Sequence, residues 1–374
     1  MNSKIIGIVI LVVAIGGASV YFLSKPDTIT PNSFENEFVT QNEKIGLVIN
    51  TITPPNSIEE LEESYKIATS SGIGRTNLYV HWNQLEPERG TYDWRVTDIM
   101  MKLNDKYNLK TTLFFSVINA DRLGPFPSWM GTQALGQTLE DDTIRVLDAI
   151  LSRYENIDYV IFAGDIDYHF QRATGSIPIY KEFFENVSSE LKDNHPNIKI
   201  GNSMSLENIL NKGLEPGGAF ELTSQLEMGD FIALSYKPTN TLGDINRTPD
   251  EAIDDLSKTI DIFQSKKLAF FEISWSTSNY VDGNNSDQAE FIKSSLNFFD
   301  ENESQIEFFT ISRLFDKPKG SCVSQDIDTV QGSSFASNSF RLERIDEYMC
   351  NSGLIDKNEN TKPAWTQLKE NISP

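Results

Sequence analysis

Apolar runs of strand length alternate with segments of helical apolar spacing along most of this chain. Segments such as "SIEELEESYKIATSSG" place apolar residues three and four positions apart, which is typical of amphipathic helices. Between them lie eight runs rich in Val, Ile, Leu and Phe, at residues 44–50, 76–82, 109–117, 157–164, 198–201, 230–236, 267–274 and 306–312. Strands that are apolar throughout indicate a parallel sheet covered on both faces. The alternation therefore predicts an α/β fold, a (β/α)8 TIM barrel over residues 44–374 with a short C-terminal extension.

The alternative arrangement of such strands is a doubly wound open sheet. No G-x-G-x-x-G or G-x-x-x-x-G-K-[ST] pattern follows any of the predicted strands, so a nucleotide-binding sheet is not supported. In a barrel, functional residues gather where the strands end at their carboxyl side. The residues that follow each predicted strand are therefore the ones to inspect.

The amino terminus has a different character. Residues 5–23 carry no charge and lie between Lys4 and Lys25, and this length suffices to cross a bilayer. We predict a signal anchor or transmembrane helix at residues 1–26, with a cleaved signal peptide as the alternative, followed by a linker at 27–43. The bias of positive charge favours a single-pass protein of the cell membrane with the C-terminal domain outside, or a secreted one if the segment is cleaved.

Charge and cysteine usage narrow the class further. The formal net charge of −22 disfavours nucleic acid as a partner. The two cysteines, Cys322 and Cys350, are predicted to form a disulfide in an extracellular setting, although two buried thiols remain the alternative. With three histidines and no C-x-x-C or H-E-x-x-H pattern, we predict neither a metal site nor a cofactor.

Two acids stand out at the ends of well-separated strands. Glu272 lies inside the apolar run "AFFEISW", where a carboxylate is costly unless it faces a polar pocket. The fourth strand runs into "AGDIDYHF", which brings Asp165 and Asp167 to the same end. Two facing carboxylates are what glycoside cleavage requires, one to protonate the leaving oxygen and one to attack the anomeric carbon or activate water. The other candidate residues near strand ends are His81, Trp82, Tyr236, Trp275 and Asp316.

Four stretches, in order, resemble clan A of the glycoside hydrolases, in particular its members related to endo-galactanases and β-galactosidases. They are "WNQLEPERGTYDW" (82–94), "DFIALSYKP" after the sixth strand, "FFEISWS" on the seventh, and the closing "GLIDKNENTKPAWTQL" (353–368). The resemblance covers residues 45–370. It implies a retaining β-glycosidase whose nucleophile is Glu272 and whose acid/base lies at Asp165.

The chain departs from the clan pattern at the catalytic end. The resemblance implies Asn-Glu after the fourth strand, and Gly164 and Asp165 stand there instead. The arginine expected on the second strand aligns with Asn77, while Arg75 lies two residues earlier and points to the same face. The tryptophan expected at the end of the eighth strand is absent from residues 306–316.

Two functions follow from these observations. The first is a membrane-anchored glycosidase that acts on a carbohydrate through Glu272 and Asp165. The second is a catalytically inactive barrel that binds a glycan at the cell surface. The predicted substrate-binding residues are His81, Trp82, Asn77, Asp167, Tyr236 and Trp275.

Overall fold

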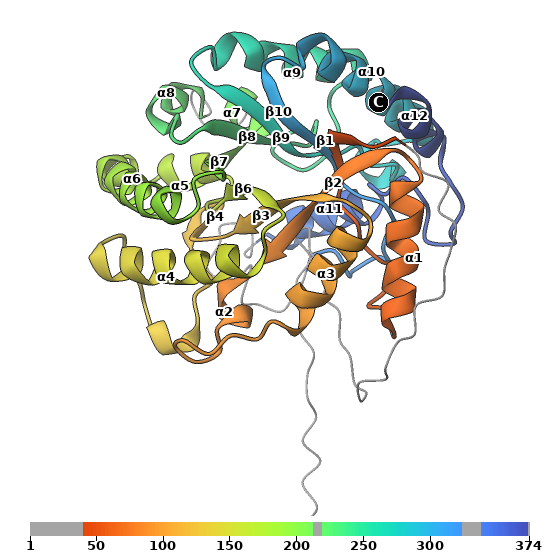
Figure 1. The fold of residues 1–374 in the computed structure, drawn as a ribbon. Coiled ribbons are helices and arrows are strands. Elements are labelled where there is room, and N and C mark those ends of the chain that lie inside the picture. The colour runs from red at the N-terminus through yellow and green to blue at the C-terminus, as the bar shows by residue number, and fades with distance from the viewer. Residues whose placement is uncertain (1–39, 212–218, 324–337, 373–374) are drawn as a thin grey trace, which may run out of the picture.

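Eight parallel strands close into a barrel in the computed structural model, which describes residues 40–211, 219–323 and 338–372 (Figure 1). Around the barrel the strands follow the order β1, β10, β9, β8, β7, β6, β3 and β2, so each strand pairs with its predicted neighbour. The strands are β1 (Asn42–Leu47), β2 (Ile73–Val80), β3 (Lys110–Phe115), β6 (Ile157–Ile161), β7 (Lys199–Ser205), β8 (Phe231–Tyr236), β9 (Lys267–Ile273) and β10 (Ile306–Ile311). The predicted (β/α)8 barrel is confirmed.

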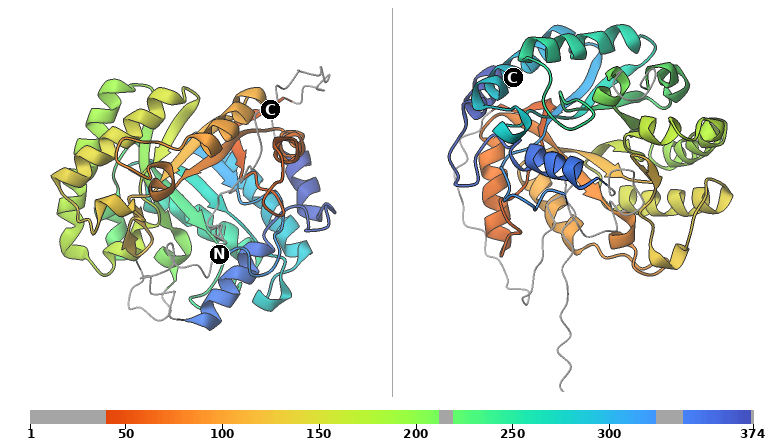
Figure 2. Two further views of the ribbon diagram at one scale, coloured as in Figure 1. Left: turned by 90° about the horizontal axis from the view of Figure 1, so that it is seen from below. Right: turned by 180° about the vertical axis from the view of Figure 1, so that it is seen from behind.

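Helices surround the barrel and cover its outer face, as both views in Figure 2 show. The longer ones are α1 (Ile58–Thr69), α3 (Arg95–Lys106), α4 (Gln137–Arg153), α6 (Ile177–Asn194), α9 (Pro249–Ile262), α10 (Asn285–Asn302), α11 (Ser339–Cys350) and α12 (Pro363–Asn371). Short helices follow several strands directly, namely α2 (Trp82–Leu85), α5 (Ile166–Phe170), α7 (Leu206–Leu210) and α8 (Thr223–Leu226). A small hairpin of β4 (Ile118–Asn119) and β5 (Arg122–Leu123) follows β3 and was not predicted.

Local capping explains where some helices begin. The Ser57 side chain accepts the Glu60 backbone N–H at the start of α1, as the sequence pattern predicts. The Glu60 carboxylate, however, accepts the backbone N–H of Asn56 at 2.9 Å, one residue earlier than a capping box requires. A complete capping box opens α9, where Thr248 and Glu251 bond each other's backbone N–H groups.

The barrel interior is filled by side chains rather than open. One apolar cluster lies inside it, and it includes the stacked rings of Phe114 and Phe271, whose centroids are 5.4 Å apart. Rings stacked in this way add to the stability gained from burying their area. The other members are Tyr159, Ile161, Phe231, Ala233, Ala269 and Phe308, with Tyr79 packed against them.

Arg75 occupies the amino-terminal end of this interior. Its guanidinium pairs with Asp158 at 2.7 Å, donates to Thr112 at 2.7 Å and stacks on the Tyr159 ring. Arg75 does point into the barrel, as the alternation along β2 predicts, but it lies at the amino-terminal end of the strands and pairs with Asp158. It does not take the place of the arginine that supports a nucleophile.

The C-terminal extension returns to the carboxyl end of the barrel. In the view from behind, α11 lies in front of the strands (Figure 2), and its Tyr348 hydroxyl donates to the backbone oxygen of Ser274, just after β9, at 2.7 Å. Asp316, predicted as an acid at the end of the eighth strand, forms an ion pair with Lys362 at 2.8 Å and accepts the Gly353 N–H. The closing motif of the chain therefore holds the exit of β10 rather than adding an acid to the site.

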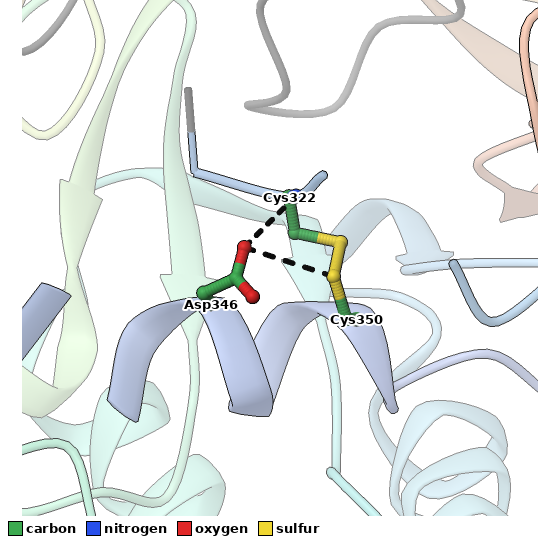
Figure 3. A group of neighbouring side chains, drawn as sticks. All are labelled: Cys322, Asp346 and Cys350. Atoms are coloured by element: carbon green, nitrogen blue, oxygen red, sulfur yellow. Dashed lines mark hydrogen bonds between the residues drawn. A yellow bond between two sulfur atoms is a disulfide. The ribbon is translucent and has the colours of Figure 1, made fainter. Parts of the chain in front are cut away.

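The predicted disulfide is present and joins the segment after β10 to the end of α11. Cys322 and Cys350 have Cα atoms 5.5 Å apart, and Asp346 accepts the backbone N–H of Cys322 at 2.9 Å (Figure 3). These two cysteines and Asp346 are close enough to resemble a metal site. Because the two sulfur atoms are bonded to each other, neither is a thiolate ligand, and the group is structural.

Within residues 40–211, 219–323 and 338–372, no helix combines the length and the apolar character needed to cross a bilayer. The predicted anchor at residues 5–23 and most of the predicted linker lie outside these ranges.

Candidate active site

Glu272 reaches the barrel interior because of a bulge in β9. Leu234 of β8 lies opposite Phe270, and the next residue, Ser235, lies opposite Glu272, so Phe271 is the extra residue. Strict alternation would turn Glu272 outward, since Phe271 already points inward. A bulge re-aims the following side chain, as often happens beside active sites. Glu272 therefore faces the site at the carboxyl end of the strands.

Tyr79 holds the Glu272 carboxylate. Its hydroxyl donates to Glu272 Oε1, and the Asn77 amide donates to the Tyr79 oxygen at 3.1 Å and to the Phe271 backbone oxygen at 3.0 Å. Burial raises the pKa of Glu272. The positive charge of Lys237 and the hydrogen bond from Tyr79 lower it, but they do not outweigh the effect of burial. Asn77, predicted to bind substrate, is buried and instead donates a hydrogen bond to Tyr79. The sequence analysis did not identify Tyr79 as a residue of the site.

Asp165 lies at the turn between the fourth barrel strand and α5. It adopts a left-handed backbone conformation (φ 48°, ψ 45°), which brings its carboxylate back toward the neighbouring strands. Its Oδ1 accepts from the hydroxyls of Ser203 at 3.3 Å and Ser235 at 2.9 Å. Its side chain remains partly exposed.

Ser235 links the two acids. It lies directly opposite Glu272 in the pairing of β8 with β9, and its hydroxyl donates to Asp165. The two carboxylates are close enough for the charge of Asp165 to raise the pKa of Glu272. The structure thus brings together the two acids singled out in the sequence, although they are separated by more than a hundred positions.

Asp167 is turned away from this centre, which corrects its prediction as a substrate-binding residue. It is fully buried and accepts from the Ser205 backbone N–H at 2.9 Å and the Asn208 amide at 2.6 Å. Burial, with the Asp165 charge, raises the pKa of Asp167 to about 8. Asp167 therefore joins α5 to α7 through its hydrogen bonds rather than facing the site.

The three aromatic residues predicted to stack on a sugar are in the protein core. Trp82, Tyr236 and Trp275 are each 1% exposed, so none offers a free ring face. The Trp82 indole donates to Glu86 at 2.7 Å and the Tyr236 hydroxyl to Asp255 at 3.0 Å. This burial corrects the prediction that these rings bind substrate.

His81 lies at the end of the second barrel strand, where the sequence analysis placed it, with its side chain withdrawn. Both of its ring nitrogens are buried without a hydrogen-bond partner among the described residues. Burial lowers the pKa of His81 to about 4, so the ring is neutral at physiological pH. Nothing in this arrangement presents a His81 nitrogen to a ligand.

Gly164 is required by close packing. A Cβ atom at this position would lie 2.6 Å from Phe114 Cζ, a distance that real contacts do not reach. The asparagine that the clan pattern places here would force the Phe114 ring, and with it the stacked Phe271 ring, to move. The loss of the asparagine is thus coupled to the aromatic filling of the barrel.

The site holds charged residues that the sequence analysis missed. Glu207 lies in α7, and its carboxylate accepts the Lys237 backbone N–H at 3.3 Å. Burial, with the Asp165 charge, raises the pKa of Glu207. Burial alone would lower the pKa of Lys237, but the charges of Glu207, Asp165 and Glu272 outweigh it and raise that pKa.

Two further cations, Arg313 and Lys317, lie just after β10. Burial lowers the pKa of Arg313, although the negative charge of Glu272 acts in the opposite direction and raises it. The sequence analysis did not single out Lys237, Arg313 or Lys317 at the strand ends. Lys237 and Arg313 were visible, since each follows a predicted strand within one residue.

Several solved glycoside hydrolases have a similar fold. A family 5, subfamily 18 glycoside hydrolase variant from Streptomyces cattleya in complex with Manβ1-4GlcNAc has a TM-score of 0.61 at 12% identity, covering 88% of this chain and 80% of that one. Xylanase 10B from Thermotoga maritima has a TM-score of 0.54 at 13% identity, covering 87% and 93%. A family 39 glycoside hydrolase from Bacteroides cellulosilyticus has a TM-score of 0.57 at 14% sequence identity, and the match covers 88% of this chain and 63% of that one.

No family model and no curated protein matches the sequence. At these identities the likeness concerns the fold. It confirms the predicted (β/α)8 barrel and leaves the activity to the residues of the site.

Proposed function

We propose that this protein is a retaining glycoside hydrolase that cleaves β-linked sugars, with Glu272 as nucleophile and Asp165 as acid/base. The observation that carries the proposal is the link through Ser235, which places a carboxylate from the fourth barrel strand beside one from the seventh. The barrel shared with glycoside hydrolases supports it. Retention requires the two carboxyl groups to act about 5 to 5.5 Å apart.

The reaction would proceed in two steps. A Glu272 oxygen forms a bond to the anomeric carbon while the glycosidic bond breaks and Asp165 gives its proton to the leaving oxygen. Water then attacks the same carbon, Asp165 takes a proton from it, and the bond to Glu272 breaks. Tyr79 donates to Glu272 before the attack and after the release, and so keeps its orientation.

The second candidate function is a barrel that binds a glycan without cleaving it. Gly164 supports it, because the packing against Phe114 leaves no room for the asparagine of the clan pattern. The buried Trp82, Tyr236 and Trp275 support neither function, since they are unavailable to stack on a sugar in either.

Activated aryl β-glycosides separate the two functions. Their leaving groups need little help from an acid, so a competent Glu272 acts on them even if Asp165 is poorly placed. We expect the purified protein to release the aryl alcohol from at least one sugar in a panel, and the first sugar product to have the β configuration by NMR. A folded protein that binds but releases none of them is a binding barrel.

The acid role can be tested against Glu207, which lies near Asp165 and has a raised pKa. We expect Asp165→Asn to lower turnover of substrates with poor leaving groups by about 10² to 10⁴, and to lower it much less with activated ones. Glu207→Gln is the matched variant and should show no such dependence on the leaving group. If Glu207→Gln shows it and Asp165→Asn does not, the acid is Glu207.

We also propose that the barrel lies outside the cell, held at the membrane by residues 5–23. The uncharged segment supports the anchor, and the Cys322–Cys350 disulfide supports an oxidising compartment. Membrane fractionation combined with thiol alkylation of intact cells tests both parts. Reduced cysteines in a protein recovered from the cytosolic fraction would overturn this location.

A further inference from the structure

Arg313 and Lys317 are two buried cations whose side chains form no ion pair with any of the described residues. Arg313 is 4% exposed and Lys317 8% exposed. Among the described residues, neither side chain forms an ion pair or a hydrogen bond, and Arg313 Nε is buried with no acceptor. Removing a cation from water without a partner is costly, so proteins bury such groups in pairs or at a ligand.

Two other cations near the carboxyl end of the barrel, Lys237 and the buried Lys362, show the contrast. The negative charges of three carboxylates, those of Glu207, Asp165 and Glu272, stabilise the charged form of Lys237. Lys362 forms an ion pair with Asp316 at 2.8 Å. Lys317 has no such compensation. The charge that acts on it is that of Arg313, which together with burial lowers the pKa of Lys317 to about 8.

The position of Arg313 connects this pair to the catalytic acids. Arg313 follows Ser312, whose backbone N–H donates to the oxygen of Ile273, the residue after Glu272, at 2.8 Å. The charge of Glu272 also acts on Arg313. An electrostatic interaction with Glu272 would by itself account for a buried cation at Arg313. It does not explain Lys317, which adds a second positive charge and is held in place by its backbone N–H bond to the Cys350 oxygen at 2.9 Å.

We propose that Arg313 and Lys317 bind an anionic group of the sugar at Glu272, so that the substrate is an acidic glycan. A carboxylate, as in a uronic acid, matches the planar donor fork of Arg313, and the terminal oxygens of a sulfate ester can accept from the same donors. The inference rests on the proposed function for the orientation of the sugar, but the anion site itself does not depend on turnover.

Binding measurements test this inference separately from hydrolysis. We expect calorimetry with the full protein to show glucuronate or galacturonate, or a sulfated monosaccharide, binding at least about tenfold more tightly than glucose and galactose. Lys317→Gln and Arg313→Gln should each remove most of that preference. Lys44→Gln removes the same charge from an exposed ion pair with Glu303 and should leave it unchanged.

The outcomes are distinguishable. Equal affinity for acidic and neutral sugars, or a preference that survives in Lys317→Gln, would overturn the anion site while leaving the hydrolase intact. Uronate binding that depends on Lys317, in a protein that cleaves no aryl glycoside, would support the anion site and reject the hydrolase. If Arg313→Gln does not fold, Lys317→Gln alone decides.

Discussion

Replacing Glu272 with glutamine is expected to lower turnover of activated aryl glycosides by on the order of 10⁴-fold or more, since the amide cannot form the bond to the sugar that the Glu272 carboxylate would form. The amide keeps the size of the side chain and can still accept from Tyr79. The folded structure should therefore be preserved, and circular dichroism would verify this. Loss of activity then reports on the chemistry of the carboxylate.

The control for this variant is Glu307→Gln. Glu307 lies at the opposite end of the barrel, where it pairs with Lys199 at 2.6 Å and accepts from Tyr159 at 2.7 Å. Its replacement should leave turnover essentially unchanged. Equal activity of Glu272→Gln and the unmodified protein would exclude Glu272 as the nucleophile.

The raised pKa of Glu272 determines where activity should fall at low pH. Burial raises the pKa of Glu272, and only the ionised carboxylate attacks, so kcat/KM should rise with pH through a value above that of an ordinary glutamate. Tyr79→Phe removes a donor that lowers this pKa, and it should move the limb to higher pH. A limb that stays in place in Tyr79→Phe would contradict this account of the carboxylate.

The largest effect on stability is expected from Glu86→Ala. Glu86 is fully buried and accepts from the Trp82 indole at 2.7 Å and the Gly90 N–H at 2.6 Å, and it pairs with Arg145 at 2.6 Å. Removing it leaves the Trp82 and Gly90 donors without an acceptor in a buried site, whereas Arg145 keeps its ion pair with Asp142 at 3.1 Å. The free energy of unfolding should fall by about 2 to 5 kcal/mol.

Chemical denaturation measures this loss, with Glu88→Ala as the matched control. Glu88 lies two residues away in the same loop and is exposed, so its replacement should change the free energy of unfolding by less than about 0.5 kcal/mol. Similar losses in both variants would show that the LEPERG stretch does not stabilise the barrel through Glu86.

The barrel could be predicted from sequence because its strands are apolar on both faces and occur in the right number. The prediction was least accurate where a strand carries polar residues. β7 continues through Asn202, Ser203 and Ser205, and the apolar run had suggested an end at residue 201. Because that strand was shortened, Glu207 seemed remote from the strand ends and was overlooked.

The two acids could be found because an isolated carboxylate in an apolar strand is conspicuous. The aromatic residues could not be assigned from sequence, because the pattern around a tryptophan at a strand end is the same whether its ring faces a sugar or the protein core. The Trp82 ring lies in the core. The inward direction of Glu272 depends on the β9 bulge, which the sequence does not reveal. Nor does it reveal that Arg313 and Lys317 form no ion pair within the part of the chain that the structure describes, which depends on side chains from other elements.

The most direct test of the central claim is to trap the sugar on the protein. Activated 2-deoxy-2-fluoro β-glycosides, neutral and uronic, slow both steps by destabilising the electron-poor transition state, while the good leaving group lets the first step proceed. The account predicts a mass increase of one fluorosugar on the peptide that contains Glu272, absent from Glu272→Gln. Turnover of aryl glycosides with no adduct, or an adduct on another residue, would contradict it.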